Sequence, residues 1–236
     1  MNKTSKICIL IIFVVMLVVI IVPTSLKKDS NDTRKDIINN VNLDEENQVI
    51  NVLLSADILY DLSDTKVMSD ISDYIAIVKI NSIDGASNIN KKTNEYVSTY
   101  SYGKASILKM LKGNIDSKEI DYTRSGGKML YTDWVKGQAS PDKVNNMMKN
   151  SKNIDLNKLL VYDKYENDID IEVGKVYLVY MYQEPSFNSV NEYVIHGFQY
   201  GLREISGDTK DYNDISKIKV KNNNTLKYED LSSIVK

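Results

Sequence analysis

The strongest feature of the hydropathy pattern is an unbroken apolar run near the start of the chain, Ile7–Val22, with lysines shortly before it and the pair Lys27-Lys28 after it. A membrane-spanning helix needs about 20 apolar residues and at least about 17, whereas the core of a signal peptide has about 7–15. Uncharged residues extend the run to position 26, and no A-x-A-like cleavage site follows. We therefore expect a single-pass membrane anchor through residues 7–26, with secretion after signal cleavage as the alternative.

The rest of the chain divides into a polar segment and a folded domain. Residues 27–62 are expected to form a polar stalk, in which the apolar positions of Val49–Leu59 indicate a short helix or strand that docks on the domain. Residues 63–236 are expected to form that domain. We expect Lys3 and Lys6 to stay on the cytoplasmic side, following the positive-inside bias, which Lys27-Lys28 opposes. Residues 1–26 would then act as anchor or signal, and the domain would lie outside the cytoplasm.

Five segments of the domain have strand patterns. Tyr74–Ile80 is apolar on both faces and rich in β-branched residues, which predicts a central strand. The apolar phase slips within Tyr96–Leu111, and Gly103 is a position where a bulge could bend that strand. Further strands are expected at Lys118–Ser125, at Val176–Tyr182 and at Tyr193–Ile205, the last broken at Gly197 and Gly201.

Helix and turn signals separate these strands. Ser140-Pro141-Asp142 supplies an N-cap, a proline at the first helical position and an acid in the first turn, and a helical stripe of apolar residues follows. The leucines of Leu156–Leu160 indicate a second short helix, and Asp84-Gly85 indicates a turn. The order of three strands, a helix and two strands predicts a mainly β fold with short helices (α+β), arranged as a five-stranded OB-like barrel behind an N-terminal transmembrane helix.

Three segments carry a resemblance to a known group of barrels: Ser72–Val78, Ala105–Gly113 and Gly174–Leu178. They resemble the frame of netrin- and TIMP-like OB barrels, and of uncharacterised exported proteins of Firmicutes with the same layout, over roughly residues 66–205. The resemblance implies the barrel fold. Protease-inhibiting members of the TIMP group use an N-terminal cysteine that this domain lacks, so their inhibitory mechanism does not carry over.

Composition excludes several chemistries. Four of the 30 basic residues flank the apolar run and no acid does, so the remainder carries 26 basic and 32 acidic residues, a net charge of −6. This charge gives no reason to expect nucleic-acid binding. The single cysteine, Cys8, lies in the apolar run, so the domain has no disulfide and no thiolate. The abundance of Asn, Lys, Ile and Tyr with little Arg, Pro or Trp is typical of an AT-rich, Gram-positive bacterial genome.

The catalytic and metal-binding patterns in the chain are weak. His196 is the only histidine and is expected to be a packed structural residue, so a zinc site or a Ser-His-Asp triad is not expected. Ser125-Gly-Gly-Lys128 matches S-x-x-K but is better explained as a turn, because the companion motifs are absent. The acidic stretch Asp163–Glu172 could bind calcium, but its acids alternate with apolar residues as on the wet face of a strand. No cofactor and no metal are expected.

Aromatic residues give the candidate binding surface. OB barrels bind ligands across strands two and three and the adjoining loops, and aromatic side chains contribute large contact areas there. The expected ligand-binding residues are Tyr100, Tyr102, Tyr122, Arg124, Tyr131 and Trp134. The alternatives are that tyrosines are half-buried at the barrel rims and that Trp134 caps the barrel core.

These observations favour a non-enzymatic function. We expect a membrane-tethered extracytoplasmic domain that binds a protein or a glycan at the cell surface, with no nucleic-acid partner. A cell-envelope hydrolase that uses carboxylates is the alternative. A transmembrane sensor is disfavoured, because only about six residues precede the apolar run, too few for a cytoplasmic signalling domain.

Overall fold

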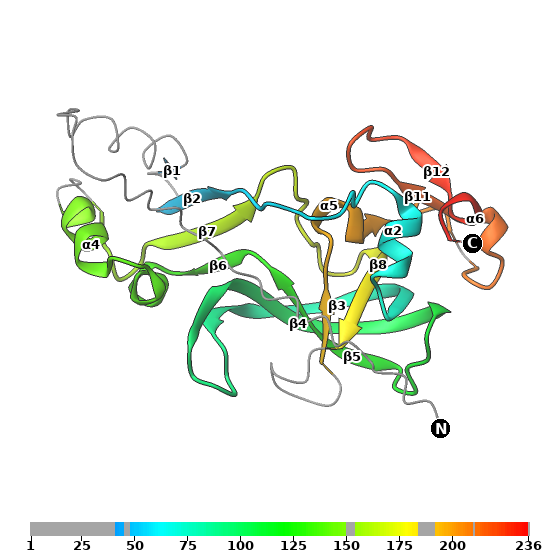
Figure 1. Cartoon of the computed structure of the whole chain (residues 1–236), viewed down its shortest axis with the longest axis horizontal. Coiled ribbons are helices and arrows are strands. Elements are labelled where there is room, and N and C mark those ends of the chain that lie inside the picture. Colours follow the sequence, from blue (N-terminus) through cyan, green and yellow to red (C-terminus); the bar gives the residue numbers. More distant parts are fainter. Residues whose placement is uncertain (1–40, 45–47, 150–153, 184–191, 210, 236) are drawn as a thin grey trace, which may run out of the picture.

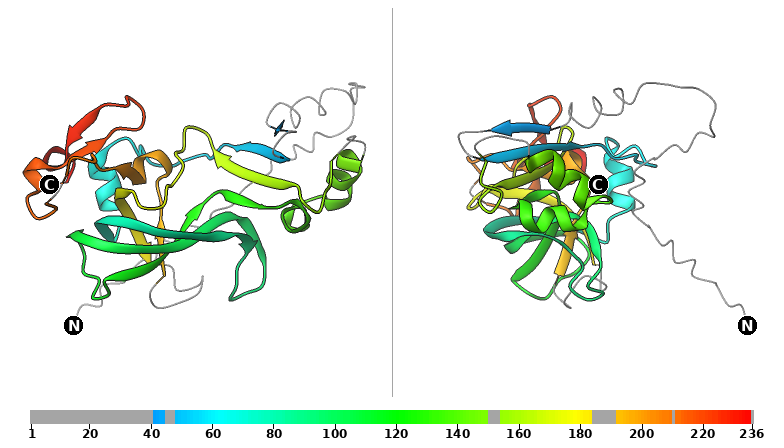
Figure 2. Two further views of the ribbon diagram at one scale, coloured as in Figure 1. Left: turned by 180° about the vertical axis from the view of Figure 1, so that it is seen from behind. Right: turned by 90° about the vertical axis from the view of Figure 1, so that its left-hand side faces the viewer.

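The structure is a computed structural model that describes residues 41–44, 48–149, 154–183, 192–209 and 211–235. It is mainly β with short helices, as the sequence predicts (Figures 1 and 2). The expected membrane anchor at residues 7–26 lies outside the described residues. No helix within the described ranges is long and apolar enough to cross a membrane.

The elements follow one another in this order along the chain. The strands are β1 Val41–Asp44, β2 Val49–Leu54, β3 Tyr74–Ile89, β4 Tyr96–Lys112, β5 Glu119–Ser125, β6 Gly127–Leu130, β7 Leu160–Tyr165, β8 Val176–Gln183, β9 Glu192–Ile195, β10 Leu202–Glu204, β11 Lys219–Lys221 and β12 Tyr228–Asp230. The helices are α2 Thr65–Asp70, α3 Tyr131–Trp134, η1 Val135–Gly137, α4 Pro141–Lys149, α5 Phe198–Gly201, η2 Ile215–Lys217 and α6 Leu231–Ile234.

Five strands form a closed ring of pairings. β3 pairs antiparallel with β4 and with β8, and β4 pairs antiparallel with β5. β5 pairs in parallel with β9, and β9 pairs antiparallel with β8, which returns the pairing to its starting strand. Two strands share one edge of β8: β10 pairs with its residues 177–179, and β9 pairs with its residues 181–183. We call these five strands the ring.

A second, smaller sheet extends from one side of the ring and has the strand order β1-β2-β7-β6 (Figure 1). β2, from the expected docking segment, lies parallel to β7 from Val49↔Leu160 to Leu54↔Tyr165. Gly126 links β5 of the ring directly to β6 of this sheet. Its φ is +82°, and a Cβ there would lie 2.7 Å from the carbonyl oxygen of Asp163, so the link requires glycine.

Three apolar cores hold these layers together. The first fills the ring with side chains of all five strands, the second packs the other face of β3 and β8 against α2, β11 and α6, and the third lies between the second sheet and α3. Alternate residues of β3 enter different cores: Ala76 and Val78 the first, Ile75 and Ile77 the second. The prediction of a strand buried on both faces is confirmed.

Other local predictions are confirmed or wrong for identifiable reasons. The helix that begins at Pro141 and the long strand from Tyr96 are confirmed. The expected turn at Asp84-Gly85 is wrong, because β3 continues through it with register shifts on β4. The helix expected at Leu156–Leu160 is wrong: these residues form a single turn, which ends where Leu160 begins β7 and pairs with Val49 of β2. The strand expected at Tyr193–Ile205 is instead β9, α5 and β10.

The bulge expected in β4 at Gly103 is instead on the neighbouring strand: beside Gly103 the extra residues of the register shifts, Asn81 and Asp84, belong to β3. A Cβ at Gly103 would lie 2.2 Å from the carbonyl oxygen of Ser82 and 3.0 Å from the hydroxyl of Tyr122. The absence of a side chain therefore lets β3 and β4 approach where the register shifts, and it leaves room for the Tyr122 side chain to reach across from β5.

Candidate functional site

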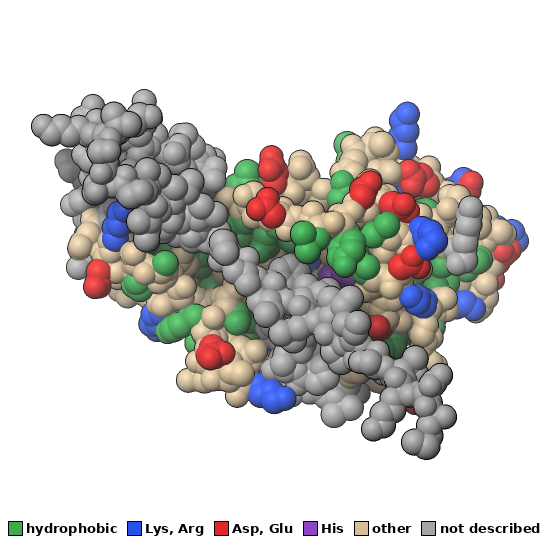
Figure 3. Space-filling view, in the orientation of Figure 1, with side chains coloured by type: hydrophobic (Ala, Val, Ile, Leu, Met, Phe, Trp, Pro, Cys, Tyr) green, Lys and Arg blue, Asp and Glu red, His purple; other side chains and the backbone are tan. Residues whose placement is uncertain are grey.

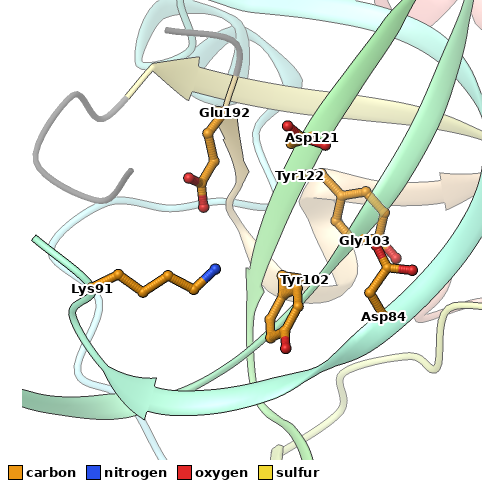
Figure 4. Close-up of a pocket in the computed structure, with 7 residues that line it drawn as sticks. All are labelled: Asp84, Lys91, Tyr102, Gly103, Asp121, Tyr122 and Glu192. Atoms are coloured by element: carbon orange, nitrogen blue, oxygen red, sulfur yellow. The ribbon is translucent and has the colours of Figure 1, made fainter. Parts of the chain in front are cut away.

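The candidate site is an open pocket of about 270 Å³ on the ring. Strands β3, β4, β5 and β9 and the turn after β3 supply its lining, and Figure 4 shows these side chains around one hollow. The lining residues are Asp84, Lys91, Tyr102, Gly103, Asp121, Tyr122 and Glu192. Three carboxylates, one ammonium group and two phenols thus surround a volume that could admit a small polar group.

The Tyr122 side chain forms a fixed, uncharged wall of the pocket. It is 1% exposed, and its hydroxyl donates a hydrogen bond to the carbonyl oxygen of Ser82 at 3.0 Å. Burial raises the pKa of the Tyr122 phenol well above its usual value, and the carboxylate of Asp84 raises it further. Tyr122 therefore offers a neutral aromatic edge at any physiological pH.

The charged side chains of the pocket differ in their partners and in their exposure to solvent. Asp121 accepts from Lys104 at 2.8 Å, so a lysine outside the lining partly neutralises it. Glu192 is the first residue of β9, lies opposite Asp121 on β5, and is only 6% exposed. Lys91 places its Nζ 4.6 Å from the centroid of the Tyr102 ring, and Figure 4 shows its ammonium end directed into the pocket. The lining is therefore net acidic.

Two of the residues expected at the binding surface reach this pocket, Tyr102 and Tyr122. Tyr100 is 5% exposed and donates its hydroxyl hydrogen to the carbonyl oxygen of Ile89. Tyr131 is 1% exposed, belongs to the third core and donates to Asn145 Oδ1 at 2.9 Å. Their burial corrects the prediction that they lie on an exposed platform: both are core tyrosines with satisfied hydroxyls.

Arg124 is also buried, and its partner corrects a second prediction. Its guanidinium pairs with the buried carboxylate of Asp168 and donates to the carbonyl oxygen of Ile169 at 2.9 Å. Asp168 was expected on the wet face of a strand, but residues 166–173 form no strand and this acid points inward. Within the part of the chain that the structure describes, no group of three or more His, Cys, Asp and Glu residues is placed to hold a metal ion.

Trp134 lies away from the pocket, at the edge of the third core. Its indole is half-buried, packs beside the Tyr131 ring at 6.3 Å between centroids, and donates from Nε1 to Asp163 Oδ2 at 2.8 Å. Thr99 donates to the same oxygen. Burial raises the pKa of Asp163, while these two hydrogen bonds lower it. Trp134 therefore braces the second sheet and neither caps the ring nor lines the pocket.

His196 has a structural hydrogen bond, as expected. Its Nε2 lies 2.9 Å from the hydroxyl oxygen of buried Ser72. The Ser72 hydroxyl donates its one hydrogen to the carbonyl oxygen of Met68 at 2.6 Å, so it must accept from the Nε2–H of His196. An imidazole protonated on the nitrogen that faces serine cannot take the serine proton. The pair is therefore no nucleophile–base dyad.

Four of the lining residues were not expected from the sequence: Asp84, Lys91, Asp121 and Glu192. Asp121 lies between Ile120 and Tyr122 on a recognised strand, so the strand pattern predicts that it faces away from the buried side that they share. Nothing local marks Asp84 or Glu192. They join the site only through the irregular continuation of β3 and through the pairing of β9 with β5.

Comparisons with known proteins identify no relative of this chain: no protein-family model, no curated protein and no solved structure matches. The functional assignment therefore depends on the pocket and on the sequence.

The environment of His196 predicts a specific dependence of stability on pH. Burial lowers its pKa from 6.5 to about 4, so between these values the unfolded chain binds a proton that the folded chain does not. Stability present above pH 6.5 is lost as the pH falls to about 4, by up to about 3 kcal/mol. His196→Gln, which can still donate to Ser72, should lack this loss.

The measurement is urea unfolding of the full chain in nonionic detergent between pH 4 and 7, for the wild type and the variant. Because all other groups titrate in both proteins, the difference between the two curves isolates His196. Parallel curves would contradict the burial of a neutral imidazole.

Proposed function

We propose that this protein is a membrane-tethered, extracytoplasmic binding domain built on an OB-like barrel, with a protein or glycan of the cell surface as its partner. The observation that carries the proposal is the position of the pocket. It lies on β4 and β5, the second and third strands of the ring, beside the turn that joins the first two strands. OB barrels bind their ligands on this face and at these loops.

The strand order supports the barrel. Numbered along the chain, the ring has the order 1-2-3-5-4-1, with strands three and five parallel. The connection between strands three and four contains α3, α4 and two strands of the second sheet. A helix-containing connection at this point is the one predicted from the sequence, and the second sheet is an addition to that layout.

The apolar run supports the tether. Residues 7–26 would cross the membrane, residues 27–62 would lead to the domain, and residues 63–236 would fold outside. Residues 27–40 alone could reach about 45 Å when extended. A domain on a segment of this length can reach partners in the cell envelope while it stays attached to the membrane.

The side chains of the pocket limit the chemical classes of partner that it could bind. Tyr102 offers a partly accessible aromatic ring, and the three carboxylates accept hydrogen bonds from hydroxyl or ammonium groups. Both are groups that a glycan or a protein surface presents. The net acidic lining opposes nucleic acid, whose phosphates would meet Asp84 and Glu192.

A hydrolase is the second candidate, because Asp84, Asp121 and Glu192 surround one volume. Glycoside hydrolysis uses a pair of carboxylates about 5–9.5 Å apart across the scissile bond. The binding function ranks first, because Asp121 is already paired with Lys104.

The tether predicts the topology. Protease added to intact cells should remove a C-terminal epitope tag, because residues 27–236 are proposed to lie outside. A cytosolic protein in the same cells should survive, as the control for lysis. A tag that is fully protected in intact cells and lost only after permeabilisation would contradict the proposal.

The pocket predicts binding. Cell-wall glycan fragments or peptides of surface proteins should shift the NMR signals of Tyr102 and Gly103 in the full chain reconstituted in nanodiscs. Tyr102→Ala should weaken this binding about tenfold or more, since an aromatic contact of this kind contributes about 1–3 kcal/mol with its buried area. Leu59→Ala, at a 95% exposed position outside the pocket, is the matched control.

Two results would count against this assignment. Shifts confined to residues outside the pocket would show that the pocket is not the site. Cleaved glycan in the titration, abolished by Asp84→Asn, would replace the binding function with the hydrolase.

A further inference from the structure

One side chain of the pocket occupies it in the way that a ligand would. Lys91 lies on the turn between β3 and β4, and its Nζ is 4.6 Å from the centroid of the Tyr102 ring. Figure 4 shows the ammonium end between Tyr102 and the carboxylate of Glu192, with Asp84 on the far wall. Among the described residues no carboxylate forms an ion pair with Lys91. Its ammonium group lies against the aromatic face of Tyr102.

The backbone that carries Lys91 is fixed independently of its side chain. The backbone amide of Asn94 donates to the carbonyl oxygen of Asn90 at 2.7 Å. The backbone amide of Asn90 donates to the carbonyl oxygen of Glu95 at 2.8 Å. The Asn90 side chain accepts from the amides of Lys92 and Thr93. The turn therefore keeps its shape if the Lys91 side chain leaves the pocket, and an exposed lysine can leave by rotation about its own bonds.

We propose that the pocket recognises an aliphatic primary ammonium group of the lysine type, and that Lys91 is a built-in competitor which the ligand displaces. The inference rests on the proposed function of this pocket as a binding site and names the class of its ligand. Three features support it: an aromatic face that a cation already occupies, a net acidic lining, and a volume of about 270 Å³ that admits an unbranched side chain.

The pocket lining explains why a cation and not an anion is the ligand. An anion would meet the carboxylates of Asp84 and Glu192, with the ammonium group of Lys91 as the single cation of the lining. A cation would gain the Tyr102 face and the field of the same carboxylates.

The experiment is calorimetric titration of the full chain, in nanodiscs of zwitterionic lipid, with Nα-acetyl-lysine methylamide. Lys91→Ala should tighten binding about two- to fivefold, the range that corresponds to an exposed cation–π contact. Lys92→Ala removes the same charge from the neighbouring position and should leave affinity within twofold. Tyr102→Ala should abolish detectable binding, while Tyr102→Phe, which keeps the ring, should bind as the wild type does.

Two further probes define the class. The Nε-acetylated lysine derivative, which has no charge, should not bind. Glucosamine, whose ammonium group sits on a rigid ring, should bind at least tenfold more weakly. Equal tightening by Lys91→Ala and Lys92→Ala would overturn the competitor role, since it would reflect net charge alone.

Failure of this inference can be told apart from failure of the proposed function. If wall glycan or surface-protein peptides shift the pocket signals while the lysine derivative does not bind, the ammonium class is wrong and the binding site stands. If glucosamine alone binds, the lysine type is wrong. If neither the probes nor the envelope fragments bind in the pocket, both proposals are wrong.

Discussion

The arrangement of this domain depends on the pairing of one short strand, β9. Its four residues pair with β5 on one side, and three of them pair with β8 on the other, so that β9 joins strands that the chain order leaves apart. The parallel contact Asp121↔Glu192 brings together two carboxylates that are about 70 residues apart in sequence, and both line the pocket. Ring closure also encloses the first core, in which Tyr122, Tyr193 and Ile195 pack against β3 and β8. Without β9, neither the core nor the pocket would be complete.

A second constraint attaches the smaller sheet to the ring through buried polar groups. Arg124 leaves β5 toward Asp168, while Asp163 on β7 accepts from Thr99 on β4 and from Trp134 on α3. A buried ion pair contributes little net stability, but loss of one partner leaves an uncompensated charge and costs about 3–5 kcal/mol. These contacts therefore specify where the second sheet lies more than they stabilise it. They also explain why Arg124 in β5 and Trp134 after it are structural and do not form a binding surface.

The sequence predicted the elements well where a local pattern determines them. The two-faced apolar run of β3, the proline at the start of α4 and the slip of the apolar phase in β4, where Leu108 is the extra residue, could all be predicted, because side-chain periodicity and backbone restrictions act over a few residues. It failed where tertiary pairing overrides local signals. Leu160 enters a strand because β2 lies beside it, and Asp168 is buried because Arg124 reaches it. Of the residues expected at the binding surface, Tyr102 and Tyr122 line the pocket. Asp84 and Glu192 join them through strand pairings between distant parts of the chain, which no local pattern in the sequence predicts.

Native-state hydrogen exchange of the β9 amides tests ring closure most directly. In the full chain in nonionic detergent, the amides of Tyr193, Val194 and Ile195 should exchange only through global unfolding, as those of Ile77 in β3 and Leu178 in β8 should. Their opening free energy should equal the free energy of unfolding measured with denaturant. Exchange of the β9 amides that is faster by several orders of magnitude, with β3 and β8 still protected, would show an open sheet edge and contradict the account.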